Sequence, residues 1–134
     1  DALYLSLQNI ASSLPIPIID LDWNHYDLTE SIPHHDQFLI DWRPDAEKII
    51  IVFTDEKPQS YLKTEDFAEI LPEDVIVAAQ SSSKVKIYVF STQTTWKWDE
   101  ISDATGGKYF ELTDNPTQMY NNLMEILDEV CKGG

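Results

Sequence analysis

Cysteine and basic residues are both scarce in this chain of 134 residues, and each shortage excludes a class of protein. The single cysteine, Cys131, cannot form a disulfide within the chain and cannot build a zinc site by itself. Nine Lys and Arg stand against 24 Asp and Glu, which gives a formal net charge of −15. Proteins that bind nucleic acids or anionic membranes need clustered basic side chains to meet phosphates. The charge therefore argues against both partners, and it suits a hard cation or a basic partner.

Long apolar runs and glycine-rich motifs are missing as well. No stretch approaches the roughly 20 apolar residues that a membrane-spanning helix needs. The four glycines form no phosphate-cradling loop, no dinucleotide-binding fingerprint and no nucleophile elbow. We therefore expect a protein that is not an enzyme. Asp1 stands in an already helical pattern without an initiator Met, which predicts a piece of a longer protein.

The apolar content is sufficient for one α/β domain over residues 1–134. A hydrophobic fraction of 43% and four Trp indicate a packed core, and the length fits a single domain. Buried strands are predicted at 48–53, 85–90 and 108–112. The unbroken apolar run from Ile49 to Phe53 predicts a strand covered on both faces. Because helical patterns alternate with these strands, we expect a parallel sheet with right-handed crossovers.

The helical patterns have recognisable ends. We predict helices at 2–13, at 64–70, from Pro72 to about residue 80, from Thr94 or Thr95 to Ala104, and from Pro116 onward. The expected buried stripe of the Pro72 helix is Val75, Ile76 and Ala79. The last helix has Asn115 as its N-cap, and its apolar face is expected to hold Met119, Leu123, Ile126, Leu127 and Val130. Gly106 and Gly107 are expected to supply the left-handed cap of the preceding helix.

Residues 15–46 are interrupted by prolines, and we predict an irregular inserted flap there. The flap carries His25, His34 and His35 together with several aspartates, and both residue types bind transition metals. Their spacing matches no defined metal site, so we interpret them as a solvated polar loop.

The carboxyl ends of the predicted strands are where chemistry is expected, since ligands of open α/β sheets bind there. Asp55 and Glu56 closely follow the first strand, and carboxylates suit Mg²⁺ or Ca²⁺. The alternative is that Asp55 only caps a turn, and its position alone favours that alternative. Hydroxyls in the loop 91–95 can cap the next helix or line a site, and capping is the favoured interpretation. Of Trp96 and Trp98, two residues apart, we expect one to pack and one to lie near the surface.

Three stretches together resemble a von Willebrand factor A-type (vWA) domain: EKIIIVFTDEKPQ, KVKIYVFST and WDEISDATGGKYFELTDN. The first is similar to that family's central strand ending in Thr-Asp, and the second to the next strand. The third is similar to the helix that ends at Gly-Gly before a short aromatic strand. The opening DALYLSLQNI resembles the helix after the family's second metal-binding loop. The resemblance implies a three-layer, Rossmann-like domain whose N-terminal strand or strands and Asp-x-Ser-x-Ser loop are absent from this chain.

The resemblance also implies a function, that of a protein-binding, adhesion-type module outside the cell or at its surface. In the vWA family the position of Asp55 holds a divalent cation, and an acidic side chain of the partner completes the coordination. Mg²⁺ or Ca²⁺ is thus expected at Asp55, with Glu56 and Asp1 as further candidate ligands. The rest of the domain is then supplied by upstream sequence or by another chain. The resemblance implies a disulfide from Cys131 to an upstream cysteine, whereas the sequence alone favours a small residue ending the last helix.

Two alternatives to this function stay open. One is an interaction or structural domain of the same fold that works without a metal, which the absent serine loop favours. The other is a metal-dependent hydrolase that uses Asp55 and the flap histidines such as His34, although no residues at suitable spacing support it.

Overall fold

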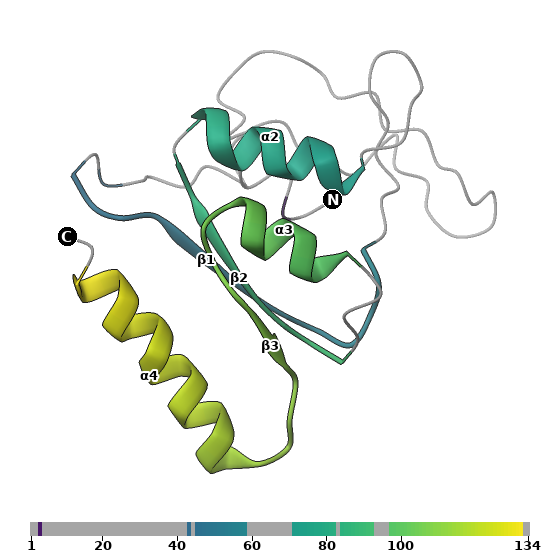
Figure 1. Ribbon diagram of the computed structural model, residues 1–134, viewed down its shortest axis with the longest axis vertical. Helices are drawn as coiled ribbons and strands as arrows, with labels where there is room; N and C mark the ends of the chain where they lie inside the picture. The colour runs from purple at the N-terminus through teal and green to yellow at the C-terminus, as the bar shows by residue number, and fades with distance from the viewer. Residues whose placement is uncertain are drawn as a thin grey trace, which may run out of the picture.

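The computed structural model of the protein describes Leu3, Arg43 and residues 45–58, 71–82, 84–92 and 97–132. Strands and helices alternate along these residues in the order β1 (Ile49–Thr54), α2 (Pro72–Ser82), β2 (Lys86–Ser91), α3 (Trp98–Ala104), β3 (Tyr109–Glu111) and α4 (Pro116–Lys132). The helices α2 and α3 cover one face of the sheet and α4 covers the other, which gives three layers (Figure 1). Apart from the helical Leu3 and a few residues near Arg43, the predicted helix 2–13 and flap 15–46 lie outside the described residues, as does the predicted helix 64–70.

The sheet is parallel and its strands are arranged in the order β1-β2-β3. Ile50 pairs with Ile87 and Val89 pairs with Tyr109. The predicted α/β class, with a small parallel sheet between helices, is thereby confirmed. The predicted strands agree with the observed ones to within one or two residues, because each is a run of β-branched and aromatic residues.

The central strand β2 divides the core into two clusters. Successive side chains of a strand point to opposite faces. Ile87 and Val89 therefore pack with Ile101 of α3 on one face, while Tyr88 and Phe90 pack with Ile126 of α4 on the other. All four of these β2 side chains are fully buried, as expected for a parallel strand covered on both faces.

The first strand is less buried than its sequence predicts. Ile50 and Val52 pack on one core cluster and Ile49 and Ile51 on the other, so both faces of the strand are covered as expected. The cover is only partial, since Ile49 to Val52 are half-buried and Phe53 is 53% exposed. The reason is the position of β1 at the edge of the sheet formed by the described strands. Phe53 stacks on the Phe90 ring, with 4.7 Å between the ring centroids.

Helix α3 begins later than predicted. Its N-cap is Lys97, in the left-handed conformation with φ 65°, so the predicted caps Thr94 and Thr95 are wrong. The helix begins at Trp98, whose side chain is buried against the core, and tertiary packing thus overrides the capping preference of threonine. No side-chain hydrogen bond caps this end.

The end of α3 follows the prediction. Gly106 has φ +79° and its N–H bonds to the Asp103 carbonyl, while Gly107 N–H donates to the Ser102 carbonyl at 2.9 Å. These two bonds form the Schellman cap that the glycines predict. Gly107 has a second role, because a Cβ there would lie 1.9 Å from the Ile87 carbonyl oxygen. The turn after α3 is thus packed directly against the backbone of β2.

Helix α4 has the predicted cap and most of the predicted face. Asn115 Oδ1 accepts hydrogen bonds from the backbone N–H groups of Thr117 at 3.0 Å and Gln118 at 3.2 Å. The residues that pack on the sheet are Met119, Leu123, Ile126 and Val130. Leu127, which was expected among them, is 49% exposed. The apolar residues of α4 cover a wider face of the helix than the part that contacts the sheet.

Helix α2 begins at Pro72 as predicted. Its preceding residue, Leu71, donates its N–H to Asp74 Oδ2 at 2.8 Å, which satisfies one backbone donor at this end of the helix. Ala78 and Ala79 are its most deeply buried residues, whereas the predicted Val75 and Ile76 are half-buried. None of the described helices has the length and apolar character needed to cross a membrane.

Candidate functional site

The carboxyl ends of the three described strands bring a row of oxygen-bearing side chains together. Thr54 pairs with Ser91, and Ser91 pairs with Glu111. Residues in register on neighbouring strands point to the same face, and here that face is the one covered by α2 and α3. The sequence gives no sign of this row, because strand register depends on pairings between distant segments.

The loop after β1 is held by Thr54 and Trp98. Thr54 Oγ1 accepts a hydrogen bond from the Glu56 N–H at 3.0 Å, which closes a short turn. The indole N–H of Trp98 donates to the Glu56 carbonyl at 2.8 Å, so this loop is tied to the start of α3. Trp98 is therefore the packed tryptophan of the predicted pair, while Trp96 lies outside the described residues.

Asp55 lies at the apex of this loop and is exposed, as is Glu56. The hydrogen bonds that form the turn are made by the Thr54 hydroxyl rather than by the Asp55 carboxylate. The turn thus keeps its geometry without help from Asp55, whose carboxylate faces solvent at the expected edge of the sheet.

Ser91 lies at the centre of the same edge. Its side chain is fully buried, and within the described part of the chain its Oγ has no hydrogen-bond partner. Leaving a buried hydroxyl unpaired costs about 1–3 kcal/mol. The backbone carbonyl of Ser91 is well satisfied, since it accepts from the Tyr109 hydroxyl at 2.7 Å and from the Leu112 N–H at 2.8 Å. Burial raises the pKa of the Tyr109 phenol, and the bond to Ser91 opposes this rise.

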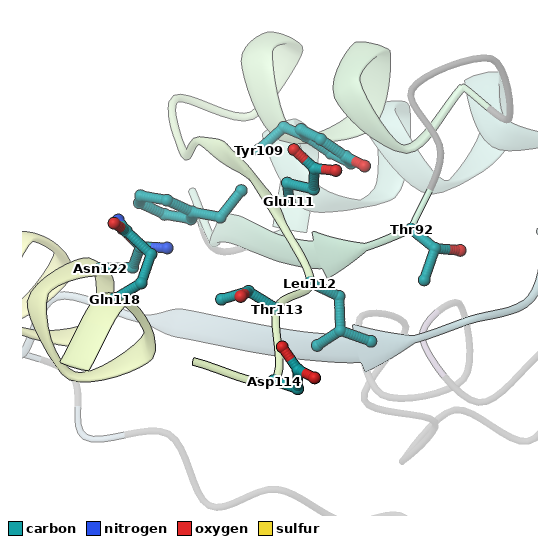
Figure 2. A pocket seen from close by; sticks show the side chains of 9 residues that line it. Thr92, Tyr109, Glu111, Leu112, Thr113, Asp114, Gln118 and Asn122 are labelled. Atoms are coloured by element: carbon teal, nitrogen blue, oxygen red, sulfur yellow. The ribbon is translucent and has the colours of Figure 1, made fainter. Parts of the chain in front are cut away.

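An open hollow of about 1090 Å³ surrounds the end of β3 (Figure 2). Its lining comprises Thr92, Tyr109, Phe110, Glu111, Leu112, Thr113, Asp114, Gln118 and Asn122. Phe110 and Asn122 are its buried members, whereas Glu111 and Asp114 are exposed and carry its only formal charges. The hollow joins the end of the sheet to the first two turns of α4, a proximity that the sequence does not predict.

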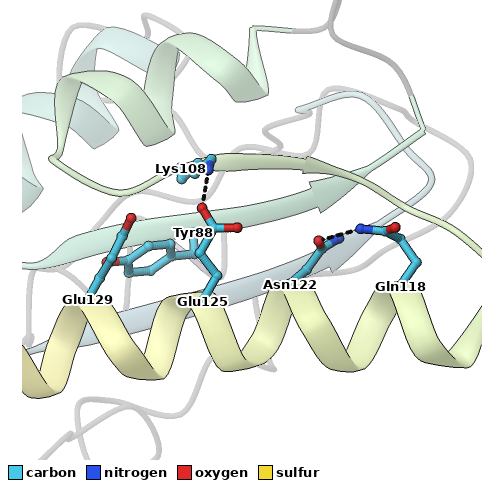
Figure 3. A network of polar contacts seen from close by, with 6 residues as sticks. All are labelled: Tyr88, Lys108, Gln118, Asn122, Glu125 and Glu129. Atoms are coloured by element: carbon cyan, nitrogen blue, oxygen red, sulfur yellow. Dashed lines mark hydrogen bonds and ion pairs between the residues drawn. The ribbon is translucent and has the colours of Figure 1, made fainter.

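Polar contacts fix α4 against the sheet beside this hollow (Figure 3). Lys108 forms an ion pair with Glu125, and this hydrogen bond raises the pKa of the lysine. The Tyr88 hydroxyl donates to Glu129 Oε2 at 3.3 Å. Burial raises the pKa of the Tyr88 phenol, and the negative charge of Glu129 raises it further.

The described residues do not fit a complete site for the divalent cation that the vWA resemblance implies. They contain no group of three or more His, Cys, Asp or Glu side chains that could hold a metal. Mg²⁺ and Ca²⁺ take about six to eight oxygen ligands, and Asp55 and Glu56 supply two carboxylates. Asp1 and the flap histidines His25, His34 and His35 lie outside the described residues. Cys131, near the end of α4, is an exposed free thiol.

Comparison of the chain with models of protein families, with curated proteins and with solved structures finds no match.

Proposed function

We propose that the chain is a vWA-like protein-interaction module that binds its partner at the carboxyl edge of its sheet, and that it is not an enzyme. The observation that supports this proposal is the exposed Asp55 on a turn built by other groups. Thr54 and Trp98 make the hydrogen bonds of the turn, which leaves the Asp55 carboxylate available for a ligand. The position also agrees with the general location of ligands in open α/β sheets.

The finer proposal concerns a cation at this carboxylate. Asp55 would hold Mg²⁺ or Ca²⁺ together with an acidic side chain of the partner, as the vWA resemblance implies. The remaining ligands would come from outside the described residues, from Asp1, from upstream sequence or from another chain, with Glu56 as a further candidate. An extracellular or cell-surface location and a disulfide from Cys131 to an upstream cysteine belong to the same proposal.

A second candidate is a module of the same fold that binds without metal. The observation that favours it is the lack of a third metal-ligating side chain near Asp55 among the described residues. The metal-dependent hydrolase is the weakest alternative, since no residues at suitable spacing in the sequence support it and a fold alone does not imply an activity.

The experiment that decides between these candidates is calorimetric titration of the complete domain, with the proposed upstream segment restored, with Mg²⁺ and with Ca²⁺. Asp55→Ala is compared with Asp103→Ala, a matched change at an exposed aspartate at the other end of α3 from the Trp98 contact. We expect saturable binding to the parent protein and to Asp103→Ala, and no binding to Asp55→Ala.

Each other outcome has a defined meaning. Cation binding that survives in Asp55→Ala contradicts the assignment of the ligand. No binding to the folded complete domain rejects the cation and favours the metal-independent module.

A further inference from the structure

We propose that the outer edge of β3 is a docking site for an extended, basic peptide segment of a partner protein, which adds to the sheet as a further strand. This surface is separate from Asp55, two strands away, and it does not depend on a cation there. Three observations carry the proposal: the free backbone edge, the hollow beside it and the charges on that hollow.

Within the described part of the chain, the backbone of β3 pairs with β2 on one side and with no strand on the other. Toward β2, the Lys108 carbonyl accepts from Val89 N–H at 3.0 Å and the Leu112 N–H donates to the Ser91 carbonyl at 2.8 Å. In a parallel ladder, the alternate residues Tyr109 and Glu111 direct their N–H and C=O groups away from β2. No group within the described residues bonds to these outward backbone groups. Such an edge is a template for strand addition.

The hollow runs along this free edge and provides room for a strand. Six consecutive residues, 109–114, line it, and Gln118 and Asn122 extend toward it from α4 (Figure 2). An extended peptide rises about 3.3 Å per residue, so a six-residue lining matches a segment of similar length. The hollow is bordered by the edge of β3 on one side and by α4 on the other. A groove of this shape favours an extended peptide over a compact ligand.

The charges of the hollow select a basic segment. Glu111 and Asp114 are exposed on its rim, and no Lys, Arg or His side chain lines it. The nearest lysine along the chain, Lys108, is paired with Glu125. The formal charge of −15 on the whole chain attracts a cationic partner from a distance as well. Because β3 offers few backbone groups, the two carboxylates must supply much of the selectivity.

The test uses a capped octapeptide of alternating lysine and valine as the probe, titrated calorimetrically into the full chain. A matched peptide with glutamate in place of lysine is the first control, and we expect it not to bind. The second control carries the same lysines but has N-methyl groups on alternate backbone nitrogens, which block strand pairing without changing the charge. Bound lysine peptide should also slow amide hydrogen exchange at Tyr109 and Glu111.

The protein variants separate the rim charges from the overall charge. Glu111→Gln with Asp114→Asn should weaken binding of the lysine peptide about five- to tenfold, as for two exposed ion pairs. The matched double variant Glu100→Gln with Asp103→Asn removes equal charge from the exposed face of α3 and should have little effect.

The proposal is overturned by any of three results in protein that is folded by circular dichroism. These are equal binding of the N-methylated and parent peptides, equal weakening by the two double variants, or no binding of the lysine peptide at low salt. The first result would leave only non-specific charge attraction, and the second would leave no role for the hollow.

Discussion

Gly107 is the residue at which the turn after α3 comes closest to the sheet. A Cβ at this position would lie 1.9 Å from the Ile87 carbonyl oxygen and 2.5 Å from its carbonyl carbon. Both contacts are with backbone, which cannot rotate away as the end of a side chain can. Gly106, its neighbour, has open space around it, with only the Lys86 side chain at 3.9 Å, and needs glycine for its positive φ alone.

We predict that Gly107→Ala lowers the free energy of unfolding by about 3 kcal/mol, as for a severe overpacking substitution. Gly106→Ala should cost about 1 kcal/mol, the usual penalty of a left-handed conformation for a residue with a Cβ. Urea denaturation of the two variants beside the parent protein measures both values. Equal losses in the two variants would show that the contact with β2 is not the dominant effect.

These two glycines also show what sequence reasoning can and cannot find at the residue scale. Gly106 was predictable, because a helix cap is local and needs only the preceding turn. The contact of Gly107 with Ile87 joins residues that are distant in the chain, so composition and spacing carry no sign of it. The unpaired hydroxyl of Ser91 was missed for the same reason, since burial of a single serine depends on what packs over it.

At the scale of elements, Tyr88 joins the central strand to the helix that covers it. Its ring is fully buried and its hydroxyl donates to Glu129 of α4. Burial raises the pKa of this phenol, and so does the charge of Glu129. Folding therefore favours the protonated tyrosine. The stability that results is fully present below the pKa of tyrosine in the unfolded chain, which is about 10. This stability is lost as the pH rises through the higher pKa of the folded state.

We predict that the free energy of unfolding falls between about pH 9 and pH 12, and that the fall is smaller in Tyr88→Phe. Part of the fall should remain in that variant, because the pKa values of Tyr109, Lys86 and Lys108 are also raised. Denaturant titrations at stepped pH provide the measurement. Tyr120→Phe, at an exposed position of α4, is the matched control and should leave the profile unchanged. A profile for Tyr88→Phe that matches the parent would contradict the assignment.

Elements were predictable from the sequence where their signal is local. The strands and the start of α4 follow from apolar runs and from the Asn-Pro cap, and both were found. The predicted start of α3 was wrong, because the helix begins where the Trp98 side chain is buried rather than at a threonine cap. The burial of β1 was overestimated because a solid apolar run does not reveal whether the strand lies at the centre or at the edge of a sheet.

At the scale of the whole molecule, the charge of −15 is the dominant electrostatic feature. Four ion pairs connect described lysines to acidic residues: Lys86–Glu47, Lys97–Glu73, Lys108–Glu125 and Lys132–Asp128. Exposed pairs of this kind contribute about 0–1 kcal/mol each. The excess of 24 acidic over nine basic residues leaves like charges that repel one another, and that repulsion destabilises the compact state.

We predict that the melting temperature rises by a few degrees when NaCl is increased from about 10 mM to about 0.5 M, because screening shortens the range of the repulsion. KCl should act in the same way, since screening depends on ionic strength rather than on the cation. Differential scanning calorimetry without divalent cations measures the effect apart from any binding at Asp55. A melting temperature that falls with salt would mean that the ion pairs outweigh the repulsion.

The position of the candidate site in the fold was predictable from the sequence, but the arrangement of its side chains and of the hollow was not. The rule that ligands lie at the carboxyl ends of parallel strands located Asp55 from the sequence alone. The row of Thr54, Ser91 and Glu111 and the hollow at β3 depend on strand register and on the placement of α4, which arise only when the chain has folded.

The strand order β1-β2-β3 has a consequence for how the molecule is made. Among the described strands, β2 pairs with β1 and β3 pairs with β2, so each later strand pairs with the one before it in the chain. During translation, β2 therefore emerges from the ribosome after its first neighbour is already outside, and β3 emerges after β2. No described strand has to wait for a neighbour that is synthesised later, and each βα segment between them can close over short sequence distances. The sheet can thus grow in the direction of synthesis. β3 is added after β2, and α4 then packs on the sheet.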